Sequence, residues 1–161
     1  MLTTPTKTEI RIGIVGSRRR NTEQDRFYVH DIVRRHIIDY EKVVVVSGAC
    51  PEGADKFAVE AVDFFKREID EGCVRLIEFP VRKWPGQTKA EFREQAYYRN
   101  RLIAENSDIG FALVHDDREG GTENTVLHYR DLGKTVYLVD GNGRTYLEGE
   151  REDVQTRGTS A

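Results

Sequence analysis

Cysteine is scarce in this chain. Cys50 and Cys73 are the only two among 161 residues, and their spacing is not that of a zinc knuckle or a redox pair. This excludes a disulfide-rich scaffold, and we interpret both residues as reduced thiols. The histidines on predicted helices, His30, His36 and His128, lack metal-ligand spacing. We therefore expect no metal site and no cofactor.

Long apolar runs are also missing. Nowhere do eighteen apolar residues follow one another, and residues 1–9 are polar. The sequence therefore predicts neither a signal peptide nor a membrane-spanning segment, and we expect a cytoplasmic protein.

The chain has no excess of basic charge. Its formal net charge is −3 and its pI is about 5.9, whereas proteins that bind duplex DNA through many phosphates usually carry a basic stripe. Basic clusters remain at residues 18–20 and 99–101. A hydrophobic content of 38% beside 33% charged residues is typical of a globular protein, and the length is that of one domain.

The chain does contain a repeated alternation of β-branched runs and helical patterns. Five strands are predicted, at Ile10–Val15, Val43–Ser47, Val74–Phe79, Ile109–Val114 and Thr135–Val139. Four helices are predicted between them, over about 22–40, 54–69, 90–106 and 123–132. Thr22 and Asp25 resemble a capping box at the first helix.

This alternation predicts an α/β fold. We expect a Rossmann-like, doubly wound parallel sheet of five strands in the order 3-2-1-4-5, with helices on both faces. One domain is expected over residues 1–140. Residues 141–161 are expected to form a largely disordered arm with at most a short strand near Tyr146.

Small-residue loops follow three of these strands. Where a strand leads into a helix, unpaired N–H groups carry partial positive charge, and glycine lets an anion approach closely. In the predicted strand order these loops meet at the switch point of the sheet, where such folds bind ligands. We therefore predict a phosphate site formed by Gly16, Ser17, Arg18, Ser47, Gly48, Ala49, Asp55, Gly120, Gly121 and Thr122. For Asp55 we keep two roles, capping its helix and contacting a ribose hydroxyl.

The third helix carries polar residues on its inward stripe. Phe92, Ala96 and Ile103 define the stripe, and Arg99 and Asn100 fall on it. A charged group that faces inward needs a partner or a ligand. We therefore expect Arg99 or Asn100 to reach the crevice, or to tie two loops together through carbonyls of the Gly120 loop.

Two acids flank the last glycine loop. Glu119 and Glu123 are the acids best placed for general acid or base chemistry, although Glu123 also suits a first helical turn. Trp84 lies in the long link before the third helix, where it either stacks on a base or pins the link to the body.

The ordered motifs resemble those of the SLOG superfamily. They are Gly16-Ser17-Arg18, Ser47-Gly48-Ala49, the segment from Tyr98 to Ala104, and Gly120-Gly121-Thr122. That superfamily includes DNA-processing protein A and the Lonely Guy phosphoribohydrolases. The resemblance implies a small stand-alone member, bacterial or from a phage, that binds a nucleotide or nucleotide-derived ligand and associates as a homodimer.

Two alternatives accompany this interpretation. Similarity to the Lonely Guy enzymes implies hydrolysis of the N-glycosidic bond of a nucleoside 5′-monophosphate, with Glu119 or Glu123 as the acid and Arg99 orienting the phosphate. The chain has Thr125 where those enzymes carry a glutamate. Similarity of the Arg99-Asn100-Arg101 segment to DNA-processing protein A implies single-stranded DNA binding instead.

Overall fold

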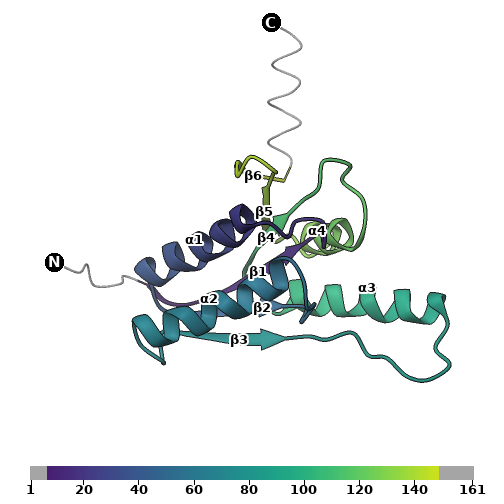
Figure 1. The fold of residues 1–161 in the computed structure, drawn as a ribbon, viewed down its shortest axis with the longest axis horizontal. Helices are drawn as coiled ribbons and strands as arrows, with labels where there is room; N and C mark the ends of the chain where they lie inside the picture. Colours follow the sequence, from purple (N-terminus) through teal and green to yellow (C-terminus); the bar gives the residue numbers. More distant parts are fainter. Residues whose placement is uncertain (1–6, 149–161) are drawn as a thin grey trace, which may run out of the picture.

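A computed structural model describes residues 7–148 of the chain (Figure 1). The expected disordered tail beyond residue 148 lies outside the described residues. The elements follow in the order β1 (Lys7–Gly16), α1 (Glu23–Asp39), β2 (Tyr40–Ser47), α2 (Ala54–Glu68), β3 (Val74–Glu78), α3 (Lys89–Glu105), β4 (Ile109–Leu113), α4 (Gly121–Asp131), β5 (Thr135–Val139) and β6 (Thr145–Leu147).

The sheet has the strand order β3-β2-β1-β4-β5-β6. The pairs from β3 to β5 are all parallel, which confirms the predicted order and the Rossmann-like α/β class. Ile12 of β1 is level with Val45 of β2 and with Ile109 of β4. β1 therefore lies between β2 and β4 at the centre of the sheet, where the strand order changes direction.

A sixth strand extends the sheet beyond the expected five. β6 pairs antiparallel with β5, so the sheet continues past the predicted boundary at residue 140. Asp140 makes this return possible because its Oδ1 accepts hydrogen bonds from the N–H groups of Asn142 and Arg144. Gly143 follows with a φ of 79°, which suits glycine. The short strand expected near Tyr146 is confirmed.

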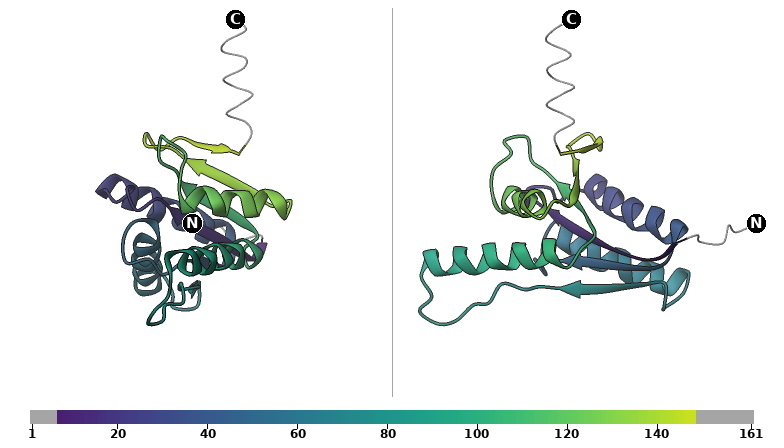
Figure 2. Two further views of the ribbon diagram at one scale, coloured as in Figure 1. Left: turned by 90° about the vertical axis from the view of Figure 1, so that its right-hand side faces the viewer. Right: turned by 180° about the vertical axis from the view of Figure 1, so that it is seen from behind.

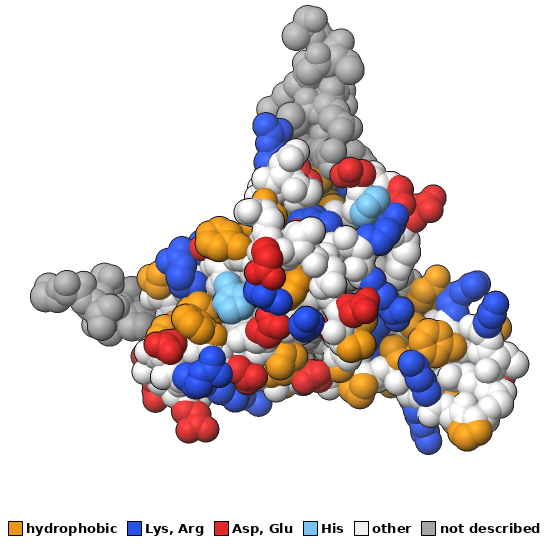
Figure 3. Space-filling view, viewed as in Figure 1, with side chains coloured by type: hydrophobic (Ala, Val, Ile, Leu, Met, Phe, Trp, Pro, Cys, Tyr) orange, Lys and Arg blue, Asp and Glu red, His pale blue; other side chains and the backbone are white. Residues whose placement is uncertain are grey.

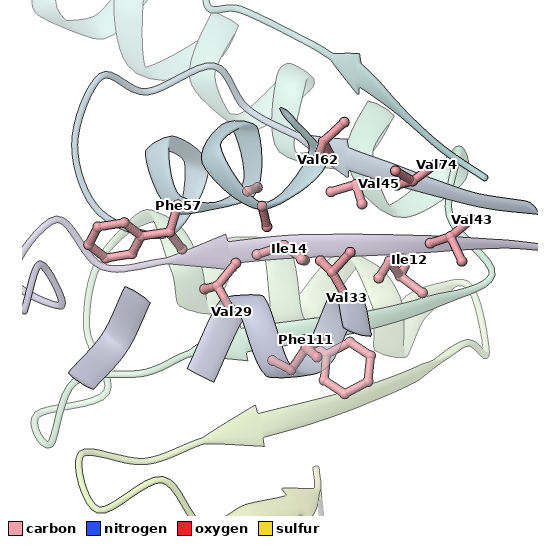
Figure 4. Packing of buried hydrophobic residues seen from close by; sticks show 14 of the residues in the cluster. Ile12, Ile14, Val29, Val33, Val43, Val45, Phe57, Val62, Val74 and Phe111 are labelled. Atoms are coloured by element: carbon pink, nitrogen blue, oxygen red, sulfur yellow. The ribbon is translucent and has the colours of Figure 1, made fainter. Parts of the chain in front are cut away.

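Helices cover both faces of the sheet, as predicted (Figure 2). β2 shows why: Val43 and Val45 pack with α1 and α2, whereas Val44 and Val46 pack with the α3 and α4 side. All four are fully buried, as expected for a parallel strand with two covered faces. Figure 4 shows the hydrophobic cluster on the α1 and α2 face, around Ile12 and Ile14.

The face of the sheet covered by α3 and α4 contains a slot for one aromatic side chain. Tyr129 of α4 is fully buried, and its hydroxyl lies 2.5 Å from the Ser107 Oγ. A Cβ at Gly13 would lie 1.9 Å from the Tyr129 hydroxyl, and one at Gly110 would lie 2.5 Å from the ring. Glycines on two adjacent strands thus provide the space that the ring occupies.

We predict that Gly13→Ala destabilises the fold by about 1–3 kcal/mol, because the added methyl group meets the Tyr129 hydroxyl. Tyr129→Phe removes that atom, and Ser107 keeps its bond to the Ile103 carbonyl. The double variant should therefore lose less stability than the sum of the two single variants. Urea unfolding of the unmodified protein, the two single variants and the double variant measures this coupling. Strict additivity would contradict the contact between position 13 and the Tyr129 hydroxyl.

Candidate functional site

A cleft of about 730 Å³ lies at the carboxyl ends of the central strands. Gly16 of β1 is level with Leu113, the last residue of β4, so the loops after these two strands begin side by side. The loop after β2 and one face of α3 complete the walls. Most of the predicted site residues line the cleft, namely Gly16, Ser17, Arg18, Gly48, Ala49, Asp55, Arg99, Asn100, Glu119, Gly120, Gly121 and Thr122.

The N-terminus of α4 faces this cleft without a side-chain cap. Gly120 occupies the N-cap position with a φ of 107°, and no side chain caps the helix there. Helices α1 and α3 begin differently, with capping boxes built on Thr22 and Thr88. The first N–H groups of α4 are therefore left for another acceptor, and the helix dipole favours an anion at this end.

Arg99 and Asn100 tie the loops together, as expected. Arg99 Nη1 donates to the Gly48 carbonyl at 2.5 Å, and its Nε donates to Asn100 Oδ1 at 2.9 Å. Asn100 Nδ2 in turn donates to the Gly121 carbonyl at 3.3 Å. The expected bond to the Gly120 loop therefore comes from Asn100, and Arg99 holds the loop after β2.

One nitrogen atom of the Arg99 guanidinium, Nη2, is available to a ligand. Within residues 7–148, Arg99 Nη2 makes no hydrogen bond, and Arg18 makes neither a hydrogen bond nor an ion pair. Burial lowers the pKa of Arg99, the carboxylate of Asp55 opposes that effect, and the charge of Arg18 adds to it. Two like charges thus face one cleft, an arrangement that a bound anion stabilises.

Asp55 does not cap α2, because Gly53 is the N-cap residue of that helix and no side chain forms a capping hydrogen bond there. Its other predicted role, contact with a ribose hydroxyl, stays a prediction. Its Oδ1 accepts from the Ser47 hydroxyl at 2.9 Å and its Oδ2 from the Cys50 N–H at 3.0 Å. Burial raises the pKa of Asp55, and these hydrogen bonds oppose the rise. Asp55 therefore shapes the loop after β2. Ser47 is fully buried beneath that loop and does not line the cleft.

The other two arginines of the first loop already have partners. Arg19 forms a two-pronged ion pair with Asp117, which joins the loops after β1 and β4. Arg20 is buried, pairs with Asp25, and donates to the carbonyls of Val114 and Val139. Arg18 is therefore the arginine of this cluster whose charge is left for a ligand.

The two candidate acids lie in different surroundings. Glu119 is exposed and lines the cleft. The carboxylate of Glu123 is held by the Arg118 guanidinium and does not line it. The structure therefore brings Glu119, and not Glu123, to the predicted phosphate site.

The sequence prediction missed one wall of the cleft. Pro80 and Val81, which follow β3, form this wall, and Tyr97 of α3 also lines the cleft, as does the predicted stripe residue Phe92. The consecutive apolar residues Phe79, Pro80 and Val81 directly after β3 were the available signal. Trp84 is 37% exposed and does not line the cleft.

Comparisons with known proteins find little that resembles this chain. No family model matches it, and no curated protein does. Among solved structures, the C-terminal domain of a hydrogenase from Pyrococcus furiosus matches with 16% identity and a TM-score of 0.41, over 84% of this chain and 92% of that domain. A likeness at this level gives no information on function.

No helix between residues 7 and 148 is both long and apolar enough to cross a membrane. Cys50 and Cys73 are both free thiols, as expected.

We predict that Gly48→Ala displaces Arg99 while the fold persists. The new Cβ would lie 2.5 Å from Arg99 Nη1 and 2.9 Å from Asp55 Oδ2, and a guanidinium at the end of a flexible chain moves more readily than backbone. NMR spectra of the arginine Nε–H groups should show the Arg99 signal shifted. Gly141→Ala is the matched control, because nothing lies within 4 Å of its added Cβ, and an unshifted Arg99 signal in Gly48→Ala would contradict the assignment.

Proposed function

We propose that this protein binds a nucleotide or a nucleotide-derived ligand, with the phosphate held between the loops after β1 and β4. The observation that carries the proposal is the combination of an uncapped α4 N-terminus with the free guanidinium of Arg18 in one cleft. Backbone N–H groups and a planar guanidinium are a recurrent pair of phosphate ligands.

The size of the cleft supports the same proposal. Small-molecule pockets measure roughly 300–1,000 Å³, and 730 Å³ lies within that range. The ordered motifs that resemble the SLOG superfamily are the ones that border this cleft, and we propose membership of that superfamily on this basis. The homodimer and the cytoplasmic location remain predictions from the resemblance and from the sequence composition.

We propose ligand recognition rather than catalysis. In the N-glycosidase alternative an acid near the phosphate site is required, but Arg118 holds the Glu123 carboxylate and Thr125 replaces the glutamate of that pattern. Glu119 is then the exposed acid in the lining.

We expect Arg18→Ala to weaken the binding of nucleoside monophosphates by about 10- to 150-fold. This corresponds to the loss of a charge-assisted hydrogen bond of about 1.5–3 kcal/mol. The free energy of unfolding should not fall, because Arg18 has no partner within residues 7–148 and repels Arg99. Calorimetry and urea unfolding give the two readouts.

The control for this experiment is Arg34→Ala, which removes an exposed arginine of α1 whose partner is Asp31. This variant should bind as the unmodified protein does. Equal affinity of the Arg18 variant and the unmodified protein would argue against the phosphate site. Weak binding of a short oligonucleotide that vanishes with moderate salt, with no affinity for mononucleotides, would favour the single-stranded DNA alternative.

We expect no free base to appear when the purified protein is incubated with each of the common nucleoside 5′-monophosphates. Chromatography of the mixture provides the measurement. Release of base that disappears in Glu119→Gln would instead establish the N-glycosidase alternative, with Glu119 as its acid.

A further inference from the structure

The apolar stripe of α3 continues beyond the part of the helix that packs on the sheet. Ile103 is 1% exposed and lies in the core. One turn earlier, Asn100 donates a hydrogen bond to the Gly121 carbonyl. The next residues on the stripe, Ala96 and Phe92, line the cleft. Figures 1 and 2 show this half of α3 and the link before it extending away from the sheet.

The facing wall of the cleft is also largely apolar. Pro80 and Val81 come from the link after β3, and Tyr97 of α3 also lines the cleft. Lys83 Nζ lies 5.5 Å from the centroid of the Phe92 ring. Figure 3 shows hydrophobic and basic side chains side by side over this extended part of the molecule. The cleft therefore has two chemically different ends.

At one end lie the uncapped α4 N-terminus and Arg18, which suit an anion. The other end presents two aromatic rings and a prolyl ring, which suit a flat apolar group. Between the ends lies Arg99, whose free Nη2 is available to a polar group. With a rise of 1.5 Å per residue, Ala96 lies about 6 Å and Phe92 about 12 Å from Asn100 along the helix.

We propose that the aromatic base of the nucleotide binds between α3 and the link after β3, with Phe92 on the helix side, Pro80 and Val81 on the link side, and Tyr97 at the edge of the site. This inference rests on the proposed phosphate site at the opposite end. A nucleoside monophosphate joins a phosphate to a flat ring through one ribose, and so matches a cleft whose walls are in turn anion-binding, polar and apolar. Every base can stack on an aromatic side chain, so the site distinguishes bases by the size of their rings. Purines, which have the larger ring system, therefore bind more tightly than pyrimidines.

Tyr97→Ala tests the base site without endangering the fold, because Tyr97 is 44% exposed. We expect this variant to bind adenosine monophosphate about 5- to 150-fold more weakly, the range seen when an aromatic stacking partner is removed. Its affinity for ribose 5-phosphate, which lacks the base, should not change. Phe92→Ala should show the same selective loss, and calorimetry measures both ligands.

The chain offers a matched control one residue away. Tyr98 is on the same helix, is 59% exposed and does not line the cleft. Tyr98→Ala should therefore bind both ligands as the unmodified protein does, and the unmodified protein should bind adenosine monophosphate more tightly than ribose 5-phosphate and cytidine monophosphate.

The outcomes separate the two proposals. If Tyr97→Ala and Phe92→Ala bind adenosine monophosphate as tightly as the unmodified protein, or if ribose 5-phosphate binds equally well, the base site is overturned and the phosphate site stands. If the unmodified protein binds neither ligand, the proposed function fails, and the base site fails with it.

Discussion

The hydrogen bonds from two neighbouring side chains of α3 hold the cleft together. Arg99 reaches the Gly48 carbonyl after β2, and Asn100 reaches the Gly121 carbonyl at the start of α4. Both bonds end on main-chain oxygen atoms, so they fix the backbone of two loops that are far apart in the sequence. The bond between the two side chains themselves then makes the bridge one continuous network.

The arginines around the cleft differ in whether they have an acidic partner. The carboxylates near the first loop pair with Arg19 and Arg20, and Glu123 pairs with Arg118. The charge of Arg18 therefore acts on Arg99 in a cleft where Asp55 is buried and occupied by loop contacts. Pairing elsewhere in the rim leaves Arg18, Lys83 and Glu119 as the exposed charged side chains of the lining without an ion pair among residues 7–148.

Much of the fold could be predicted because its signals are local. The valine run of β2 indicates a strand buried on both faces, and Thr22 with Asp25 indicates a helix start. The loop positions followed from the strand order, because parallel strands end at a common edge. Ion-pair partners could not be predicted. Arg18 and Arg19 are equivalent in the sequence, and only the position of Asp117, 98 residues beyond Arg19, makes them different.

The sequence by itself therefore determined the strands, their order and the glycine loops that meet at one edge, because side-chain periodicity and backbone freedom act over a few residues. Only the tertiary structure decided which charges stay free, that Ser47 lies beneath the loop while Asp55 shapes it, and that the link after β3 forms a wall of the cleft. These features depend on contacts between distant segments, and such contacts exist only once the helices have packed on both faces of the sheet.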